Sequence, residues 1–519
     1  MTEETTAAPA RRRAGRGSGT VRTAPSTAKY RHLKHRMPPT PMVSEDELEA
    51  IHNTSLQILE EMGMDFMHEG ARAILKKAGA DVKPGSERVR FDRNLILEAI
   101  KTCPSEFTLH ARNPERNVHI GGKNLAFAQV ASPPNCSDMD KGRRAGNQQD
   151  FRNLVKLAQR YDIIHLTGGY PVEPVDLHAS VRHLDCLSDM AKLTDKAFHA
   201  YSLGKERNQD GLEIARIARG ISYEQMEREP SLFSIINSSS PLRLDTPMLQ
   251  GILEMSSRNQ IIMLTPFTLA GAMAPVTLAG ALAQQNAEAL AGIALTQLVR
   301  PGAPVVYGGF TTNTDMRSGS PAFGTPEGAW ALLAGAQLAR HYRLPYRGSG
   351  SLTSSKLADA QGATETMWNL WPCVLGHANL VMHAAGWLEG GLTVSFEKLM
   401  IDAEQLAMFA HFLRGFPIDD SSLALDSIAA VGPGGHHFGT AHTQARFDSE
   451  FFATALADRS GYDSWLAGGG RDTAQRAHGM WRQLLAQYSE PPMDPALREE
   501  LRAYVARRSL ELRDVQLFY

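Results

Sequence analysis

The residues of this chain that could do chemistry follow a series of short apolar runs. Each run ends in a segment that is rich in glycine, serine or aromatic residues and holds few acids. Such segments offer shape, hydroxyl groups and backbone donors more readily than strong general acids. The candidate segments are residues 132–135, 170, 237–240, 266–275, 310–317, 349–355 and 386–387.

Aromatic side chains near these segments suggest a site for a cation. The electron-rich faces of aromatic rings attract quaternary ammonium groups. Tyr307 and Phe310 stand at the end of one apolar run, and either a core role or a binding role fits them. The other candidates are Trp330, Trp368, Trp371 and Trp387. Trp330 falls in the apolar stripe of a predicted helix, so we assign it to the core.

The sequence gives little evidence for a metal site, for a serine hydrolase or for nucleotide-driven chemistry. His436, His437 and His442 are close in the chain, but no carboxylate or cysteine completes a familiar ligand spacing. We therefore predict no metal site. The sequence contains neither a Gly-x-Ser-x-Gly elbow nor a glycine-rich phosphate loop. This argues against a serine hydrolase and against nucleotide-driven chemistry.

The elements that must position these segments alternate between strand and helix. Short apolar runs rich in β-branched residues predict strands. They cover residues 125–130, 163–168, 197–203, 232–236, 261–265, 304–310, 345–348 and 379–384. Amphipathic patterns predict helices at residues 148–160, 176–193, 208–219, 244–258, 278–299, 325–341 and 357–374, with another from about 401.

Eight such units have the number and length of a (β/α)8 barrel, an α/β fold of the TIM type. A doubly wound open sheet is the competing fold, but no Gly-x-Gly-x-x-Gly fingerprint follows an early strand. In a (β/α)8 barrel the active site lies at the carboxyl ends of the strands. The candidate segments all stand at those ends, so we expect them to meet in one site.

The chain divides into four predicted parts. Residues 1–43 hold nine Lys and Arg against two Glu, and we expect a disordered basic tail. Ser44 and Glu47 form a capping box that opens an N-terminal α/β cap, residues 44–122. The barrel takes residues 123–415. Residues 416–519 form a C-terminal loop and helices that pack on the barrel.

The overall composition is that of an ordinary globular protein, with 43% hydrophobic and 21% charged residues. Its four cysteines are widely scattered, which predicts reduced thiols and a cytoplasmic protein. The uncharged run 259–287 is long enough to cross a membrane. Pro266, Gly271 and Pro275 interrupt it, so we interpret it as a barrel strand, a loop and a buried helix.

Several longer blocks resemble the trimethylamine methyltransferase family of corrinoid-dependent enzymes. The resemblance extends from about residue 40 to the C-terminus and is carried by ordered blocks rather than by a single short motif. The blocks are residues 266–281 (PFTLAGAMAPVTLAGA), 301–309 (PGAPVVYGG), 315–317 (DMR), 354–356 (SSK), 401–404 (IDAE), 432–435 (GPGG) and 440–443 (TAHT).

The resemblance implies methyl transfer from a methylated amine to the cobalt of a separate corrinoid protein, so no cofactor is expected to bind tightly to this chain. Family members that act on trimethylamine carry pyrrolysine in the loop after strand seven. Here that loop, residues 347–351, has only ordinary residues (RGSGS). The chain is therefore similar to the non-pyrrolysine branch, whose members use quaternary amines such as glycine betaine, proline betaine or carnitine.

For such a substrate we expect positioning and charge complementarity rather than acid catalysis, and no catalytic residue is assigned. Tyr307 and Phe310 are the candidates for the cationic head. The candidates for a carboxylate are Asn237, Ser238, Ser349 and Ser351, with His436 or His442 closing over the site. Glu327 begins a helix, and the sequence leaves open whether it serves the helix dipole or the substrate.

Two other readings stay open at this point. The chain could be another enzyme on the same fold, such as a tetrahydrofolate-linked demethylase or a trimethylamine methyltransferase without pyrrolysine. It could also bind quaternary ammonium compounds without catalysis. The sequence specifies neither the substrate's tail nor the native methyl acceptor nor the oligomeric state.

Overall fold

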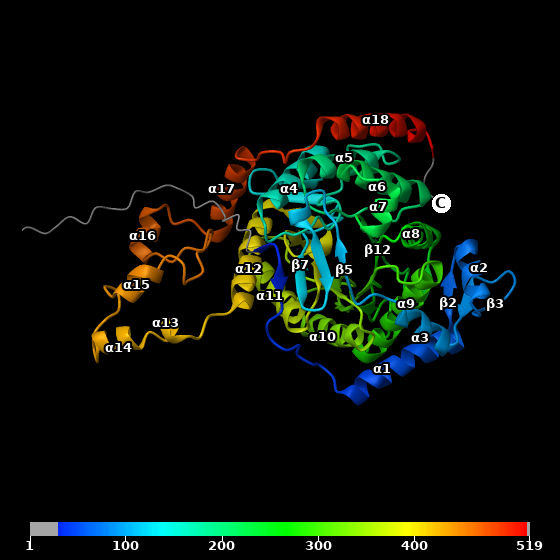
Figure 1. Cartoon of the computed structure of the whole chain (residues 1–519), viewed down its shortest axis with the longest axis horizontal. Coiled ribbons are helices and arrows are strands. Elements are labelled where there is room, and N and C mark those ends of the chain that lie inside the picture. The colour runs from blue at the N-terminus through cyan, green and yellow to red at the C-terminus, as the bar shows by residue number, and fades with distance from the viewer. Residues whose placement is uncertain (1–29, 516–519) are drawn as a thin grey trace, which may run out of the picture.

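The computed structural model describes residues 30–515, and its centre is a closed barrel of parallel strands (Figure 1). The neighbours run in the order β7, β18, β17, β14, β12 and β10, all parallel. Their bounds are β7 Asn124–Phe127, β10 Phe233–Ile236, β12 Ile261–Leu264, β14 Val305–Gly308, β17 Tyr346–Ser349 and β18 Leu380–Met382. The gap between β7 and β10 is bridged by residues 166, 197 and 199, which confirms the predicted (β/α)8 barrel.

Strand positions two and three, predicted at 163–168 and 197–203, pair only through single bridges. Two buried histidines replace parts of the missing ladder. The Phe127 amide donates to His165 Nδ1 at 2.9 Å, and the Ile235 amide donates to His199 Nε2 at 3.1 Å. Because each imidazole satisfies an amide of the adjacent strand, the barrel closes there without regular strand pairing.

Helices surround the strands, as Figure 1 shows. Their bounds are α4 Gln148–Arg160, α5 Arg182–Leu193, α6 Lys205–Arg219, α7 Tyr223–Arg228, α8 Thr246–Ser257, α9 Leu278–Val299, α10 Pro326–His341, α11 Ala360–Leu375 and α12 Phe396–Arg414. Side chains cap several of their first turns, such as Asn147 on α4, Thr325 on α10 and Ser395 on α12. The uncharged run 259–287 becomes β12, a loop and the start of α9, and none of the described helices has the length and apolar character of a membrane span.

The inner face of α10 differs from the prediction. Trp330 was assigned to the core, but its side chain is 45% exposed. The buried face of this helix carries mainly small residues, among them Ala331, Ala334 and Gly335. Small side chains let α10 approach the strands closely, so the bulky Trp330 stands on the outer ridge.

A hairpin closes the amino end of the barrel. It consists of β5 Glu106–Leu109 and β6 Val118–Gly121. Its residues Leu109, Ala111, Val118 and Ile120 share one buried cluster with inward-facing strand residues such as Phe233, Met263, Val306 and Leu380. The interior below the candidate site is therefore filled with apolar side chains.

Residues 30–43 are ordered, which corrects the upper boundary of the predicted basic tail; residues 1–29 lie outside the described part of the chain. Strand β1, Leu33–Lys34, pairs antiparallel with β7 through Leu33 and Leu125. Leu33 and His35 are buried, and His35 Nε2 donates to the Ala378 carbonyl at 2.9 Å. Composition alone missed this strand because its apolar side chains are few and separated by charged residues.

The N-terminal region then packs on the outside of the barrel. Helix α1, Glu45–Gln57, begins with the predicted Ser44 capping box and continues as a π-helical turn, Ile58–Met62. The remaining elements are β2 Met64–Phe66, α2 Glu69–Lys77, β3 Asp81–Val82, β4 Arg88–Arg90 and α3 Arg93–Lys101. Short strand β11, Arg243–Leu244, adds to β2 and so ties this region to a barrel loop.

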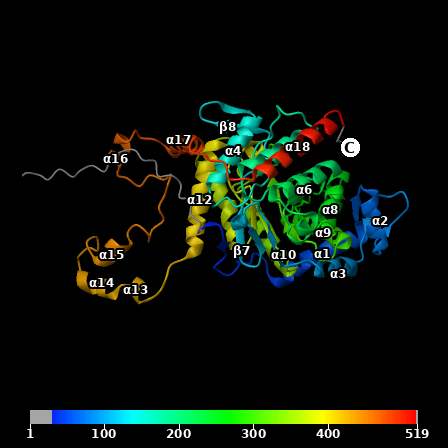
Figure 2. The ribbon, with the colours of Figure 1, turned by 45° about the horizontal axis from the view of Figure 1, so that its top comes forward.

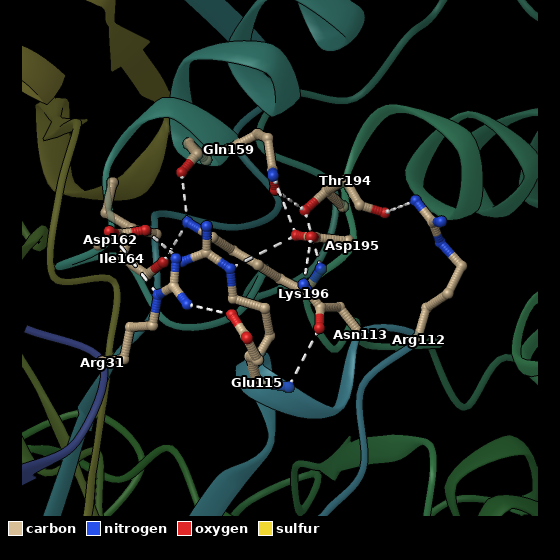
Figure 3. A network of polar contacts seen from close by, with 12 residues as sticks. Arg31, Arg112, Asn113, Glu115, Gln159, Asp162, Ile164, Thr194, Asp195 and Lys196 are labelled. Atoms are coloured by element: carbon tan, nitrogen blue, oxygen red, sulfur yellow. Dashed lines mark hydrogen bonds and ion pairs between the residues drawn. The ribbon is translucent and has the colours of Figure 1, made fainter. Parts of the chain in front are cut away.

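A charged network lies at the amino ends of strand positions two and three (Figure 3). Lys196 is fully buried, and its Nζ donates to the carbonyls of Ala158, Tyr161 and Ile164. Burial lowers the pKa of Lys196 to about 7. The network is at the face opposite the strand ends that build active sites, so we assign it to stability.

Two small sheets cover the carboxyl ends of the strands. One has the order β19, β20, β8 and β9, and the other β13, β15 and β16. Their bounds are β8 Asn135–Asp138, β9 Gly142–Ala145, β19 Trp387–Leu388, β20 Thr393–Ser395, β13 Leu269–Ala270, β15 Thr312–Thr314 and β16 Pro321–Ala322. The strands of both sheets lie in the loops that contain the candidate segments.

The C-terminal part contains both packed and projecting helices. Helices α17 Thr473–Ala486 and α18 Pro495–Leu512 lie against the barrel; Tyr504 and Arg508 of α18 donate to Asp210 of α6. Helices α13 Asp420–Leu423, α14 Leu425–Val431, α15 Ala441–Arg446 and α16 Tyr462–Ala467 project from the barrel, and both views show them apart from it (Figures 1 and 2).

Candidate functional site

A cavity of about 270 Å³ lies at the carboxyl ends of the barrel strands. All eight strand positions contribute to it. In barrel order the contributors include Ser132, Gly168, Tyr201, Asn237, Phe267, Phe310, Arg347 and His383. The predicted segments thus meet at one place, where a (β/α)8 barrel builds its active site.

Arg347 is the most unusual group of this cavity. It stands on β17 and is only 1% exposed. Its Nη1 donates to Ser349 Oγ at 2.6 Å and to the Gly309 carbonyl at 3.2 Å, and its Nε is buried with no hydrogen-bond partner. None of the described residues that line the cavity is acidic. A buried cation without an anion is costly, so this geometry calls for an anionic ligand.

The charge of Arg347 persists despite its burial. Loss of hydration lowers the pKa of this guanidinium to about 10. The side chain therefore stays protonated at neutral pH. A planar guanidinium with a free Nε–H can bind a carboxylate through two parallel hydrogen bonds.

Two neutral histidines add further donors. His383 Nδ1 accepts from the Ala131 amide at 3.3 Å, which leaves the hydrogen on Nε2. His199 Nε2 accepts from Ile235, and its Nδ1–H is buried with no partner. Burial lowers the pKa of His383 well below its usual range and that of His199 to about 3. Both rings therefore act as uncharged donors toward a ligand that accepts.

An aromatic cluster forms another wall of the cavity. Phe310 is its hub, with ring centres 4.8 Å from Phe267, 5.9 Å from Phe323 and 6.3 Å from Trp387. Trp387 stands edge-on to Phe323 at 5.5 Å. Tyr201 also lines the cavity, held by a 2.6 Å hydrogen bond between its hydroxyl and Ser132 Oγ. Such walls suit an alkylated ammonium group.

Backbone strain coincides with this cavity. Ser132 has φ 74° and His383 has φ 52°, both in the left-handed region that side chains with a Cβ rarely adopt. They end the first and the eighth strand, which are neighbours in the closed barrel. Strained non-glycine residues that persist in a fold concentrate at functional sites.

Buried polar groups behind the cavity fix its loops. Ser351 donates to the His383 carbonyl at 2.9 Å, and Asp402 accepts from the Gly386 amide at 2.8 Å while paired with Lys398 at 2.6 Å. Glu288 of α9 accepts from Ser238 and from the Leu242 amide. These contacts hold the loops that present His383, Trp387 and Asn237 without touching the cavity themselves.

The structure separates the predicted site residues into two groups. Phe310 and Asn237 line the cavity. Tyr307 does not, because it is fully buried on the outer face of β14, where its hydroxyl donates to Asn286 at 2.9 Å and accepts from Gln285 at 3.1 Å. Ser238, Ser349 and Ser351 lie behind the cavity and orient its loops or Arg347.

His436 and His442 also lie away from the cavity. His436 is exposed and His442 is half-buried on the projecting segment, and neither lines the cavity. His442 Nε2 approaches the Ser421 carbonyl at 3.2 Å within that segment. The sequence suggested that one of these histidines closes over the site. In this conformation neither of them does so.

Sequence reasoning missed Arg347, His383 and His199. Arg347 did have a signal, because it is a lone charged residue inside a predicted buried strand. A buried arginine needs an anion or a function. The two histidines had a weaker signal, since each stands in an apolar run where an ordinary core histidine is equally expected.

The loops at the barrel mouth carry exposed apolar side chains among charged ones. Several loops that follow the strands expose one large hydrophobic side chain each, between 42% and 71% exposed. They are Met139, Val175, Leu203, Val276, Met316, Leu357 and Leu392. Exposed apolar side chains that gather on one face of a protein are typical of surfaces that contact another molecule.

The chain is similar to several known methyltransferases. A family model described as trimethylamine methyltransferase (MTTB) matches residues 10–513. A glycine betaine methyltransferase of Desulfitobacterium hafniense (strain Y51) is 40% identical over 476 residues, covering 92% of this chain and 98% of that protein.

Trimethylamine methyltransferase MttB of Desulfitobacterium hafniense (strain DSM 10664 / DCB-2) is 31% identical, covering 89% of this chain and 92% of that protein. The crystal structure of the Methanosarcina barkeri monomethylamine methyltransferase MtmB has a TM-score of 0.46 and 10% identity, covering 86% and 88% of the two chains. The extent of the family match and the identity to its members settle the classification: this chain belongs to the trimethylamine methyltransferase family.

Proposed function

We propose that this protein transfers a methyl group from a carboxylated quaternary amine, a betaine, to the cobalt of a corrinoid protein. Glycine betaine is the simplest such substrate, and a glycine betaine methyltransferase is among the relatives. The cavity combines an aromatic wall with a set of hydrogen-bond donors. A betaine has the matching groups, a trimethylammonium head and a carboxylate.

The buried, unpaired guanidinium of Arg347 is the observation that carries this proposal. A site built only for trimethylamine has no use for a buried cation. Trimethylamine is itself protonated near neutral pH, so Arg347 would repel it. A substrate carboxylate instead supplies the anion that the site lacks, and the N–H groups of His383 and His199 offer it further hydrogen bonds.

The chemistry needs little from the protein beyond this placement. The reduced cobalt of the corrinoid supplies the nucleophile. As the C–N bond of one methyl group breaks, its electron pair stays on nitrogen, and the amine leaves uncharged. No proton has to be delivered, which agrees with a cavity whose described lining residues include no acid. Phe310, Phe323 and Trp387 hold the ammonium head, and Arg347 holds the other end, so that a methyl group faces the mouth.

The mouth also fits a large methyl acceptor. Its rim is formed by loops that follow the carboxyl ends of the strands and expose apolar side chains, among them Val276, Met316 and Leu357. A protein that carries its own corrinoid can cover this rim and present the cofactor to the substrate. This chain therefore contributes the substrate site and the docking rim, whereas the corrinoid belongs to the partner.

A substrate comparison tests the proposal. The purified chain is supplied with free cob(I)alamin and either glycine betaine, choline or trimethylamine, and methylation is followed by the cobalamin spectrum. Choline has the same cationic head without a carboxylate. We expect turnover of glycine betaine or a longer betaine and little turnover of the other two compounds. Equal rates on choline would overturn the role of the carboxylate, and activity on trimethylamine alone would assign the chain to tertiary amines.

A binding measurement distinguishes the enzyme from a protein that binds betaines without catalysis. Isothermal titration with glycine betaine in the absence of cobalamin reports affinity without chemistry. Binding that is never followed by methyl transfer, either to free cob(I)alamin or to a corrinoid protein, would make the chain a binding protein and refute the enzymatic proposal.

A further inference from the structure

Two apolar surfaces of this chain are left uncovered by residues 30–515, the part that the structure describes. The first is the arm, residues 416–451, which contains α13, α14 and α15. None of these three helices has a buried residue. The arm exposes large apolar side chains, from 49% for Phe447 to 82% for Phe438; they are Phe416, Ile418, Leu423, Leu425, Ile428, Phe438, Phe447 and Phe451. A segment this apolar is not built to remain in water.

The second surface is the groove, an apolar hollow of about 660 Å³ on the side of the barrel. Helices α10 and α11 form its walls, with Met42 and Gln405 at its edge. Trp330 and Trp368 line it with about half of their surface exposed, 45% and 49%. Two half-exposed tryptophans in one hollow are unusual for a surface that only meets solvent.

An exposed strip joins the two surfaces. Trp371 of the groove packs edge-on against Phe412 of α12, with ring centres 5.4 Å apart. Met408 and Phe412 are each 48% exposed on α12, and Phe416 follows directly on the arm. Groove, helix and arm thus form one continuous apolar surface. In Figures 1 and 2 the arm leaves the barrel beside α12.

The position of the arm argues against the corrinoid protein as its partner. In a (β/α)8 barrel each helix runs back from the carboxyl ends of the strands to their amino ends. The arm begins after the last residue of α12, Arg414, whose carbonyl accepts from Arg36 at 2.7 Å, close to β1 at the amino end of β7. It therefore leaves from the face opposite the mouth, where the methyl acceptor has to dock.

We propose that the arm of one copy lies in the groove of a second copy, so that two copies exchange arms around a two-fold axis. Each copy then presents both halves of the contact, and the assembly closes as a dimer. The four exposed phenylalanines alone offer on the order of 400–700 Å². A stable dimer buries about 800 Å² on each partner. The aliphatic residues of the arm supply the difference.

The oligomeric state of the full chain tests this inference. Sedimentation or light scattering gives the mass of the wild type, an arm variant (Phe438→Ser with Phe451→Ser) and a groove variant (Trp368→Glu). We expect a dimer for the wild type and at least a ~100-fold weaker dimer for each variant, because such central apolar anchors dominate interfaces. Leu510→Ser on α18, where Leu510 is 80% exposed, is the matched control and leaves the dimer intact. Circular dichroism verifies that each variant is folded.

Mixing the two variants gives the sharper result. The intact arm of the groove variant can still enter the intact groove of the arm variant, so one of the two contacts is restored and a mixed dimer forms. Each variant alone lacks both contacts. A monomeric wild type, dimers that survive in both variants, or no recovery on mixing would overturn the proposal. An arm variant that stays dimeric but no longer methylates a corrinoid protein would instead assign the arm to that partner.

Discussion

The Arg347 guanidinium carbon lies 5.1 Å from the centre of the Phe310 ring. Arg347 belongs to β17, Phe310 follows the neighbouring strand β14, and both residues line the cavity. Phe310 thus shields a buried cation that no acid among the described lining residues neutralises, and it also belongs to the aromatic wall. The contact places the donor for a carboxylate next to the wall for an ammonium group, a separation that suits a short zwitterion.

Replacing Arg347 should remove recognition of the carboxylate. We expect Arg347→Met to raise KM for glycine betaine at least ~30-fold, since loss of one partner from a buried charged hydrogen bond costs roughly 2–5 kcal/mol. Arg347→Lys should recover only part of the affinity, because an ammonium cannot form two parallel bonds. The measurement is initial methyl transfer to free cob(I)alamin.

The control for this series is Arg317→Met, a change at an exposed arginine near the mouth that removes the same charge. We expect it to leave KM unchanged. An Arg347→Met enzyme that is folded and has the wild-type KM would refute the assignment of the carboxylate site.

Substitution of Phe310 should affect substrate binding, whereas substitution of Tyr307 should affect stability. Phe310→Leu removes aromatic surface from the cavity and should weaken substrate binding by up to ~30-fold, the value of a desolvated cation–π contact of about 2 kcal/mol. Tyr307→Phe leaves Asn286 and Gln285 without their hydroxyl partner, at a cost of about 1–3 kcal/mol in stability. Kinetics and thermal unfolding of both variants distinguish the roles. A raised KM in folded Tyr307→Phe would restore Tyr307 to the site.

Glu288 should act as a positioning residue. Its carboxylate accepts from Ser238, Ser240, Gln284 and the Leu242 amide, and it thereby fixes the loop that presents Asn237. In Glu288→Gln one acceptor oxygen becomes a donor, so we expect a loss of about 1.5–3 kcal/mol in stability together with a raised KM. Glu327→Gln, at the first turn of α10, is the matched control and should cost at most about 1 kcal/mol. Equal effects of the two changes would contradict this role.

Lys196 should make the free energy of unfolding increase as the pH rises above 7. Its pKa is lowered from 10.5 to about 7 in the folded protein. Between these values the unfolded chain binds more protons at this site, so the contribution of Lys196 to the free energy of unfolding rises with pH, by up to ~1.4 kcal/mol per unit. The measurement is the difference in unfolding free energy between wild type and Lys196→Met from pH 7 to pH 9.

That difference should grow in favour of the wild type as the pH increases. The same comparison with Lys205→Met, at an exposed lysine, should be flat. A Lys196 difference that falls or stays constant over this range would show that the ammonium keeps its proton, held by the three carbonyls.

Two truncations should separate the ordered N-terminal segment from the residues before it. Deletion of residues 1–29 leaves β1, Leu33 and His35 in place, and we expect no change in melting temperature. Deletion of residues 1–43 removes the pairing of β1 with β7 and uncovers the apolar surface that Leu33 buries. It should lower the melting temperature by several degrees. Equal melting temperatures of the two truncated proteins would contradict a structural role for β1.

Much of the barrel could be predicted because the signals for its helices lie in neighbouring residues of the sequence. The predicted helices at 148–160 and 278–299 match α4 and α9 residue for residue. Caps and a 3.6-residue period depend only on neighbouring residues. The strands 163–168 and 197–203 were less regular than predicted, because His165 and His199 accept amides that a neighbouring strand would otherwise take.

The candidate site could be predicted by location but not residue by residue. Strand β14 is apolar on both faces, so its sequence does not reveal which side chains point inward. The structure places Val306 inside the barrel and Tyr307 outside. The same ambiguity hid Arg347, whose inward direction depends on the phase of β17. Phe310 and Asn237 were found because they follow their strands, where the barrel rule applies without knowledge of that phase.

The hairpin of β5 and β6 closes the amino end of the barrel, so among the described residues the cavity opens at the carboxyl end. Leu109, Val118 and Ile120 fill the barrel from below, so no small molecule can pass through its axis. Substrate and demethylated amine must therefore use the entrance at the carboxyl ends of the strands, which in our proposal a corrinoid protein covers. Under that proposal turnover has an obligatory sequence. The amine enters first, the corrinoid protein docks and departs with the methyl group, and only afterwards can the product escape. An excess of corrinoid protein should consequently inhibit the enzyme by trapping product inside.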